Sequence, residues 1–414
     1  MAGASGREGQ HPHPGKVSGW LGGWLGKVFE LSPAGLNWPR AVLVLDVLLV
    51  PLVLFWTIGY EQYLLSAVFG LLFAVAVDPG GGYGQRASRI AVFAVTGAGV
   101  TALGFGIGAD AWGWLVLATF AVTLVAGLAV LFGAHRFAAA LLLNIWFIVA
   151  LALASALHHQ SFVTSYTWAQ VSAWTGGCVL WIVVTFLAWL VRGRHDQPPV
   201  LAEVPGDTAR RKLSSPIIMF ALIRALAMAG TVAIAWGANL SHGYWMAIAC
   251  IIALRPGLDQ STLYAVQRLA GALIGAGVAI LLLLIPANVH GLKLLATVVG
   301  LEVVALVLLV HGVATRFWNY AVYCAAIAAA VLTLLDLPQP TNYDAEGYRV
   351  LWTLCGVVVG VVVMFLADLL GKRRAGQARR DQPGRQPGDG RGVPPPRDPA
   401  GQQDQVRQRA AGGG

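Results

Sequence analysis

The sequence predicts an all-α, polytopic membrane protein with about twelve transmembrane helices. Two features of the composition predict this class: 57% of the 414 residues are hydrophobic, and only 11% are charged. A soluble domain carries about 25% charged residues, so this chain has too few polar side chains to cover a soluble surface. The apolar content also excludes disorder for most of the chain, because disordered segments are poor in apolar residues.

Twelve apolar stretches are long enough, or nearly long enough, to cross a bilayer core, which requires about 20 helical residues. Helices are expected because backbone groups in lipid must pair within their own segment. A barrel would need alternating polar and apolar residues, and runs such as Val278–Ile285 do not alternate. The predicted spans are 41–60, 62–77, 87–107, 111–132, 136–157, 167–191, 215–236, 241–254, 262–285, 290–310, 316–335 and 348–370.

The positions of the basic residues predict the orientation, since cytoplasmic loops carry an excess of Lys and Arg. With the N-terminus inside, only Lys293 and Arg349 of the 28 Lys and Arg residues fall on the outer side. We therefore expect a multi-pass protein of the inner (plasma) membrane with both termini in the cytoplasm. Residues 1–40 lack the unbroken apolar core of a secretory signal and are predicted to form a cytoplasmic N-terminal segment.

The chain repeats itself once, with a period of about 178–180 residues. Asp78-Pro79-Gly80 after the second span matches Arg255-Pro256-Gly257 after the eighth, and Gly97–Val100 matches Gly275–Val278. Each copy has an even number of spans, six, so the two repeats are parallel. The predicted domains are a first six-helix repeat at 41–191, a cytoplasmic linker at 192–214, a second repeat at 215–371, and a disordered basic tail rich in Pro, Gly and Gln at 372–414.

Candidate substrate-binding residues gather in the second repeat. Short spans that end at Pro-Gly in both halves indicate a binding site between repeats, and Arg255 stands at one of these turns. Arg224 and Arg268 lie inside spans, where a charge costs about 2.5–3.5 kcal/mol unless it faces the bundle interior or water. Arginine binds carboxylates with two hydrogen bonds, and Tyr244 and Trp245 could stack on an aromatic ring. The alternative interpretations are arginines that snorkel to inner phosphates or form a structural ion pair, and an interfacial aromatic belt.

Two acidic residues are candidates for proton coupling. Glu302 lies near the middle of the tenth span, and Asp46 lies about two turns into the first. A carboxyl group removed from water readily holds a proton, which suits a role in coupling. Glu302 could instead pair with an arginine or remain protonated.

The second half carries a motif that resembles a known family. Its residues are an Arg-Pro turn, a threonine and an Arg-x-x-Gly-x-x-x-Gly helix, preceded by a Gly-Tyr-Trp segment: Gly243, Tyr244, Trp245, Arg255, Pro256, Thr262, Arg268, Gly271 and Gly275. In these residues the chain resembles the fusaric acid resistance family, also called the aromatic acid exporter family. Ala272 replaces the usual Thr, and Asp78 stands in place of the Arg in the first half. The resemblance implies efflux of aromatic carboxylates or similar organic anions.

The domain organisation also departs from that of the family, and other protein classes are alternatives. Many family members carry a large cytosolic domain after each six-span unit, whereas this chain has a short linker and a short tail. A major-facilitator-type transporter also has two parallel six-span repeats, and the loop from Asp78 to Arg86 resembles its cytoplasmic motif. An anion channel is a further alternative. A membrane-embedded transferase is less favoured, since the outer loops are short and hold no carboxylate pair.

The sequence indicates few other partners. The four cysteines all lie within predicted spans, so we expect neither a metal site nor a disulfide framework. We expect no enzymatic activity, no cofactor and no nucleic acid, because no nucleic-acid-binding fold surrounds the arginines of the tail. The expected partners are the lipid bilayer and a small organic anion, and self-association as a homo-oligomer is left open.

Overall fold

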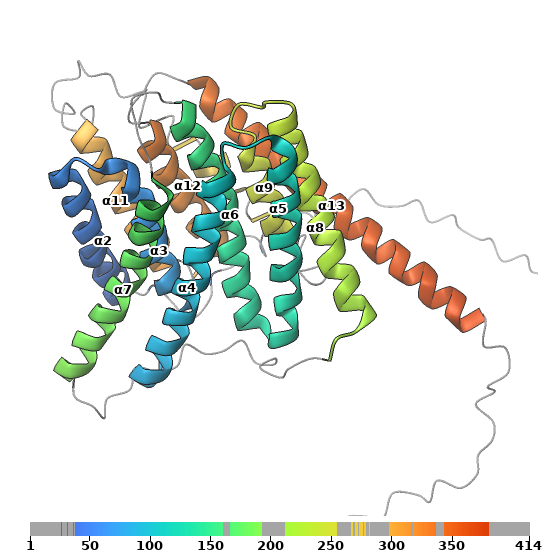
Figure 1. Ribbon diagram of the computed structural model, residues 1–414, viewed down its shortest axis with the longest axis horizontal. Coiled ribbons are helices and arrows are strands. Elements are labelled where there is room, and N and C mark those ends of the chain that lie inside the picture. Colours follow the sequence, from blue (N-terminus) through green and yellow to red (C-terminus); the bar gives the residue numbers. More distant parts are fainter. Residues whose placement is uncertain are drawn as a thin grey trace, which may run out of the picture. The chain divides into compact units, whose positions relative to one another are not determined.

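The computed structural model describes residues 38–159, 166–192, 212–254, 298–315, 318–336 and 343–380, with residues 26, 31, 36 and parts of 266–281. Regular secondary structure in this part of the chain is helical throughout (Figure 1). The first half contributes α2 (Trp38–Ile58), α3 (Leu64–Val77), α4 (Tyr83–Ile107), α5 (Trp112–Leu128), α6 (Ala134–His159) and α7 (Thr167–Arg192), with short 3₁₀ turns at Glu61–Tyr63 and Ala129–Phe132. The second half contributes α8 (Ser215–Gly237), α9 (Tyr244–Ala253), α11 (Val298–Thr315), α12 (Tyr320–Asp336) and α13 (Tyr343–Arg380).

Six of the described helices are long and apolar enough to cross a membrane: α2, α4, α5 with its 3₁₀ extension, α6, α7 and α8. Five shorter apolar helices occupy Glu61–Val77, Tyr244–Ala253, Val303–Thr315, Tyr320–Ala330 and Leu351–Ala367. The described helices fall where eleven of the predicted spans were placed, and most of the span at 262–285 lies outside the described residues. The all-helical prediction is therefore confirmed, while twelve membrane crossings in two repeats remain a prediction.

The last helix extends further than the predicted span. α13 continues to Arg380, although the tail was expected to be disordered from residue 372. Apart from Gly376, residues 372–380 are Ala, Arg, Lys and Gln, which are good helix formers, and the first proline after the span is Pro383. The chain divides into two compact units, Met1–Ala367 and Asp368–Gly414. The helix bundle belongs to the first unit.

The second helix of each half is short. α3 has 14 residues and ends at Asp78, before Pro79, where the backbone becomes extended. Proline cannot donate a hydrogen bond and disfavours a helical residue before it, and the turn then needs positive φ at Gly80 and Gly81 (+73° and +79°). α9 has 10 residues, of which the nine from Trp245 to Ala253 are buried. A helix buried on every face belongs inside the bundle.

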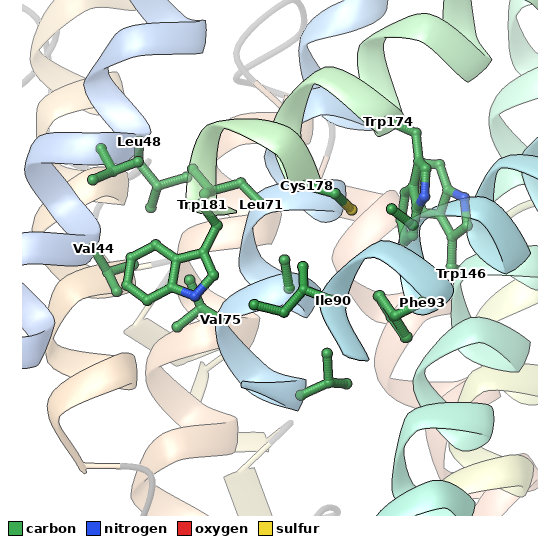
Figure 2. Close-up of a cluster of buried hydrophobic side chains, with 14 of the residues drawn as sticks. Val44, Leu48, Leu71, Val75, Ile90, Phe93, Trp146, Trp174, Cys178 and Trp181 are labelled. Atoms are coloured by element: carbon green, nitrogen blue, oxygen red, sulfur yellow. The ribbon is translucent and has the colours of Figure 1, made fainter. Parts of the chain in front are cut away.

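Two large hydrophobic clusters hold the helices together. The first is centred on the first half and includes the aromatic side chains of Trp146, Trp174 and Trp181 (Figure 2). Leu309 of α11 and Ala330 of α12 belong to the same cluster. The second is centred on α8, α9 and α13, and it also takes in side chains of α5 and α6. Each cluster thus combines one half of the chain with helices from the other.

The halves contact each other in a reciprocal manner. α5, the fourth helix of the first half, packs along α8, the first helix of the second half, and Gly127 lies directly against Ala221. α11 packs along α2 through Ala41, Val310 and Ala314. α11 falls on the tenth predicted span, which is the fourth span of the predicted second repeat. The same pair of helix positions then meets on both sides of the interface.

One glycine contact recurs in both halves at the expected spacing. A side chain at Gly177 of α7 would collide with the carbonyl oxygen of Ala67 on α3. A side chain at Gly356 of α13 would collide in the same way with the carbonyl oxygen of Met246 on α9. Both partners of the second contact lie 179 residues after those of the first (356 − 177 = 246 − 67 = 179). Small residues let helix backbones approach closely in membranes.

Replacing these glycines tests how tightly the bundle is packed. We expect Gly177→Ala and Gly356→Ala each to destabilise the protein by about 1–3 kcal/mol, because the new methyl group meets a backbone oxygen that cannot move aside. Gly176 has no neighbouring atom within 4 Å, so Gly176→Ala should be neutral or slightly stabilising, since alanine favours a helix by about 1 kcal/mol. Thermal unfolding in detergent provides the comparison. Equal effects of Gly177→Ala and Gly176→Ala would contradict the described contact.

Candidate functional site

Arg224 is a charged side chain buried within the helix bundle. It lies in the third turn of α8 and is 1% exposed. Burying a charge costs free energy unless neighbouring groups compensate it. The groups around this guanidinium are therefore important for its role. Its burial also argues against the alternative that it snorkels to lipid phosphates, because a snorkelling head group lies at the surface.

The neighbours of Arg224 come from both halves of the chain. Its guanidinium carbon lies 5.0 Å from the centroid of the Phe137 ring, and Phe137 is in the first turn of α6. This is a cation–π distance, and such contacts contribute about 2 kcal/mol when desolvated. Arg224 also lies within electrostatic range of the Cys250 thiol on α9. The side chain therefore stands at the interface between α6 of the first half and α8 and α9 of the second.

A small polar group occupies the same interface region. The amide nitrogen of Asn144 on α6 donates a hydrogen bond to the hydroxyl of Thr123 on α5 at 3.1 Å. Thr119 is one turn away on α5, on the same face, and its buried hydroxyl has no hydrogen-bond partner among the described residues. The sequence analysis did not identify Thr119, and threonines in apolar helices carry no distinctive spacing. α5 packs along α8, so these polar groups lie beside the helix that carries Arg224.

The predicted aromatic residues Tyr244 and Trp245 are the first two residues of α9. Their ring centroids are 5.7 Å apart. Trp245 is 9% exposed, and its Nε1 has no hydrogen-bond partner in the described part of the chain. Cys250, which Arg224 approaches, is five residues further along α9, about 7 Å along the helix axis. Trp245 is thus buried rather than part of an interfacial belt, on the same short helix that Arg224 approaches.

The other predicted site residues are described only in part. Asp46 is on α2 and is exposed on the surface of the bundle. Glu302 belongs to α11, but its side chain lies outside what the structure describes. Arg255 and Arg268 lie outside the described residues. The structure therefore places Arg224, Tyr244 and Trp245 around α8 and α9 and leaves the rest of the predicted set as a prediction.

A second buried charge, which the sequence analysis did not assign to a site, lies at the end of α3. Asp78 is 2% exposed. Its Oδ1 accepts hydrogen bonds from Arg86 Nε at 2.8 Å and from the Gly80 amide at 3.0 Å. Its Oδ2 accepts from Arg86 Nη2 and from Trp181 Nε1, the latter at 3.1 Å. The carboxylate thus joins the end of α3 to the start of α4 and to α7.

These hydrogen bonds control the protonation of Asp78. Burial alone raises the pKa of this carboxyl group, but the hydrogen bonds and charge of Arg86, with the donors of Gly80 and Trp181, hold the pKa below its usual value. The site is therefore a closed ion pair. Within the described residues, no three His, Cys, Asp or Glu side chains gather closely enough to bind a metal ion.

The comparisons with known proteins bear on the second half of the chain. Residues 225–363 match the family described as fusaric acid resistance protein-like. The match begins one residue after Arg224 and ends within α13. It confirms the resemblance that the motifs of the second half indicate, and that family is one of membrane transporters. No curated protein and no solved structure gives a significant match to the chain.

The Asp78 ion pair makes a testable contribution to stability. We expect Asp78→Asn to destabilise the protein by about 1–3 kcal/mol, because it removes the partner of Arg86, whose side chain is 13% exposed. Since the folded-state pKa is lowered, the wild-type contribution is present above the unfolded pKa of about 3.9 and is lost as the pH falls through the folded value. Thermal unfolding from pH 7 to pH 3 should show this loss in the wild type and not in Asp78→Asn. Asp110→Asn, at an exposed carboxylate, serves as the control and should behave like the wild type.

Proposed function

We propose that this protein is a transporter of the inner (plasma) membrane that exports aromatic carboxylates or other small organic anions. The observation that carries this proposal is the burial of Arg224 between helices of the two halves, in a helix long and apolar enough to cross a membrane. The transporter family matched by residues 225–363 supports the transport class. The anionic substrate is inferred from the chemistry of the site.

The chemistry of Arg224 suits a carboxylate. A guanidinium presents several N–H donors in a planar fork that matches both oxygens of a carboxylate. The Phe137 ring lies against the guanidinium, with the guanidinium carbon 5.0 Å from the ring centroid. We propose Arg255 and Arg268 as further ligands for the anion, on the basis of the sequence motif that contains them.

Tyr244 and Trp245 would recognise the aromatic part of the substrate. They begin α9, the buried short helix that Arg224 approaches at Cys250. Aromatic side chains stack on one another at ring-centroid distances of 4.5–7 Å in general, and the Trp245 N–H offers an additional donor. An aromatic carboxylate could place its ring near Trp245 and its charge near Arg224.

We further propose that the chain forms two parallel six-helix repeats that rock against each other around this site. The recurrent glycine contact, 179 residues apart, supports the repeat. So does the reciprocal packing of α5 on α8 and of α11 on α2. Parallel repeats related by an axis along the membrane normal are a common transporter architecture, and substrate sites in such proteins lie at the interface of the repeats.

The membrane position follows from the same topology. Exposed aromatic residues gather at the helix ends that the basic residues predict to be external: Trp56, Tyr60, Trp112, Trp114, Tyr166 and Trp168. Trp and Tyr are enriched at membrane interfaces. This distribution supports a surface that faces the lipid bilayer, while the proposed cytoplasmic position of the termini depends on the basic residues. A homo-oligomer would have to use part of that lipid-facing surface.

Transport of a labelled aromatic carboxylate tests the proposal. Proteoliposomes containing the full chain should take up benzoate faster than empty liposomes, and Arg224→Lys should reduce the rate at least about tenfold, because an ammonium group cannot form the planar two-bond contact. Arg136→Gln is the matched control, since Arg136 is exposed and also lies over a ring, that of Phe132, at 5.7 Å. Its rate should equal that of the wild type. Thermal unfolding should first show that wild type and Arg224→Lys are both folded. Equal transport rates for the two proteins would then reject the role of Arg224 in substrate binding.

Coupling to protons is a separate prediction, based on Asp46 and Glu302. In proteoliposomes with a pH gradient, the wild type should accumulate benzoate against its concentration gradient. Asp46→Asn or Glu302→Gln should abolish this accumulation, because an amide cannot carry the proton. The rate of benzoate exchange down its gradient should stay within about threefold of the wild-type rate. Accumulation driven by membrane voltage alone, unchanged in both variants, would favour the anion-channel alternative instead.

A further inference from the structure

The first helix of the second half, α8, is joined to the first half along most of its length. Near the start of α8, a side-chain carbon at Gly127 of α5 would come within 2.9 Å of the Cα of Ala221. At the end of α8, a carbon added at Gly237 would lie 3.8 Å from the indole of Trp112, the first residue of α5. The contacts are 16 residues apart on α8 (237 − 221) and 15 apart on α5 (127 − 112). The helices are therefore antiparallel and stay in register over about 23 Å.

A hydrogen bond fastens the end of α8 to a second helix of the first half. Nε1 of Trp236 donates to Oγ of Ser155 on α6 at 3.2 Å. The same Oγ lies 2.9 Å from the carbonyl oxygen of Gly108, directly after α4. Near the start of α8, the ring of Phe220 lies beside that of Phe137 on α6, with the centroids 6.2 Å apart. α8 is thus attached to α5 and α6 near both of its ends.

Sliding of α8 along α5 is blocked by side chains. A slide of one helical turn would bring Thr123 or Leu131 to the place of Gly127, opposite Ala221. The helices are too close at this point to admit a larger side chain. The same slide would break the hydrogen bond from Trp236. Packed interfaces of this kind adopt discrete arrangements and do not deform continuously, so we expect α8 to move with the first half.

The next helix, α9, is held by a different partner. A side chain at Gly356 of α13 would collide with the carbonyl oxygen of Met246, and one at Gly360 would come within 2.7 Å of the Cβ of Ala253. These contacts fix α9 to α13 along about two turns of α9. Within the described residues, no glycine contact joins α9 to α6, or to α8 beyond the connecting turn. The packing there is between apolar side chains, which permits small shear movements.

The chain changes partner in the turn at 238–243, between α8 and α9. Asn239 and His242 have φ values of +49° and +58°, and among the described residues they are the non-glycine residues with positive φ. In hinges, a few loop residues absorb the change in backbone angles. A movement between α8, packed on the first half, and α9, packed on α13, would have to be absorbed in this turn.

We infer that α8 moves with the first half, and that the boundary between the moving parts lies in the turn at 238–243 and not in the linker at 192–214. This inference refines the movement of the two repeats and rests on the proposed function. Arg224 would then be carried by the first half, and Trp245 would be carried by the pair of α9 and α13. A substrate that contacts both residues would bind across the boundary and favour one relative position of the two parts.

Cross-links on the two sides of α8 test this boundary. In the benzoate assay, Trp112→Cys with Gly237→Cys is bridged by a short bifunctional thiol reagent, and Gly127→Cys with Ala221→Cys is bridged by oxidation. Each bridge joins helices that move together, so the transport rate should stay within about twofold of that of the same variant after reduction.

A third bridge crosses the boundary itself. The Cβ atoms of Ala235→Cys and Gly243→Cys would lie about 3.0 Å apart, close to the separation found in disulfides. Closing this bridge should lower the rate at least about tenfold, because it restrains the turn, and dithiothreitol should restore the rate. Each variant is its own folding control, since the bridged and reduced forms of one protein are compared. Wild type treated in the same way controls for the native thiols and should not change.

Two results of the cross-linking would overturn the inference. One is a reversible tenfold loss of rate on bridging α5 to α8 by either pair. The other is an unchanged rate when the bridge across the turn is closed.

Distances between spin labels give a readout that does not require transport. Labels at Leu117 of α5 and Leu226 of α8, both exposed, should give one narrow distance distribution in nanodiscs, with and without benzoate. Labels at Leu226 and at the exposed Val358 of α13 should give a broader or two-peaked distribution. Equal widths for the two pairs would contradict the inference. Absence of benzoate flux in every variant would reject the proposed function, and the label distances would then decide which part of the chain α8 moves with.

Discussion

The bundle depends on helix backbones that touch each other at glycines. Lipid tails are as apolar as leucine, so the hydrophobic effect does little to hold helices together once they are in the membrane. Close packing must supply the attraction. Gly177 lets α7 touch the backbone of α3, Gly356 lets α13 touch α9, and Gly127 lets α5 touch α8. Because the contact of Gly177 fixes the short helix α3, it also positions the turn that follows this helix.

Close packing leaves no water to solvate polar groups, and the two buried charges meet this constraint differently. The Asp78 carboxylate is satisfied by four hydrogen bonds from neighbouring elements, and its charge is neutralised by Arg86. Such a site is complete in itself and links α3, α4 and α7. Arg224 instead lies over Phe137, between helices of the two halves. This difference is why the proposed substrate site is placed at Arg224 and not at Asp78.

The sequence predicts the helices well and the site incompletely. Helix positions follow from apolar runs and Pro-Gly turns, which are local signals. The predicted end of the last helix differs from that of α13, because helix-forming residues after Lys372 were assigned to a disordered tail. Burial of Arg224 was expected from the cost of a charge in lipid. Its contact with Phe137 was not, since the two residues are 87 positions apart (224 − 137) and no periodicity links them. The hydrogen bond from Trp181 to Asp78 likewise depends on which helices are neighbours, and local sequence patterns do not predict helix neighbours.

The two halves differ most where their charges should correspond. The shift that carries Gly97 onto Gly275 (275 − 97 = 178) also carries Asp46 onto Arg224 (224 − 46 = 178). The first helix of each half thus bears one charge at a matching position, with opposite signs. Arg224 is buried against α6 and α9, whereas Asp46 is exposed on α2. A strictly symmetric pair of repeats would bind the same ion twice. In the proposed function the two charges would therefore have different roles, with Arg224 binding the anion and Asp46 exchanging the proton.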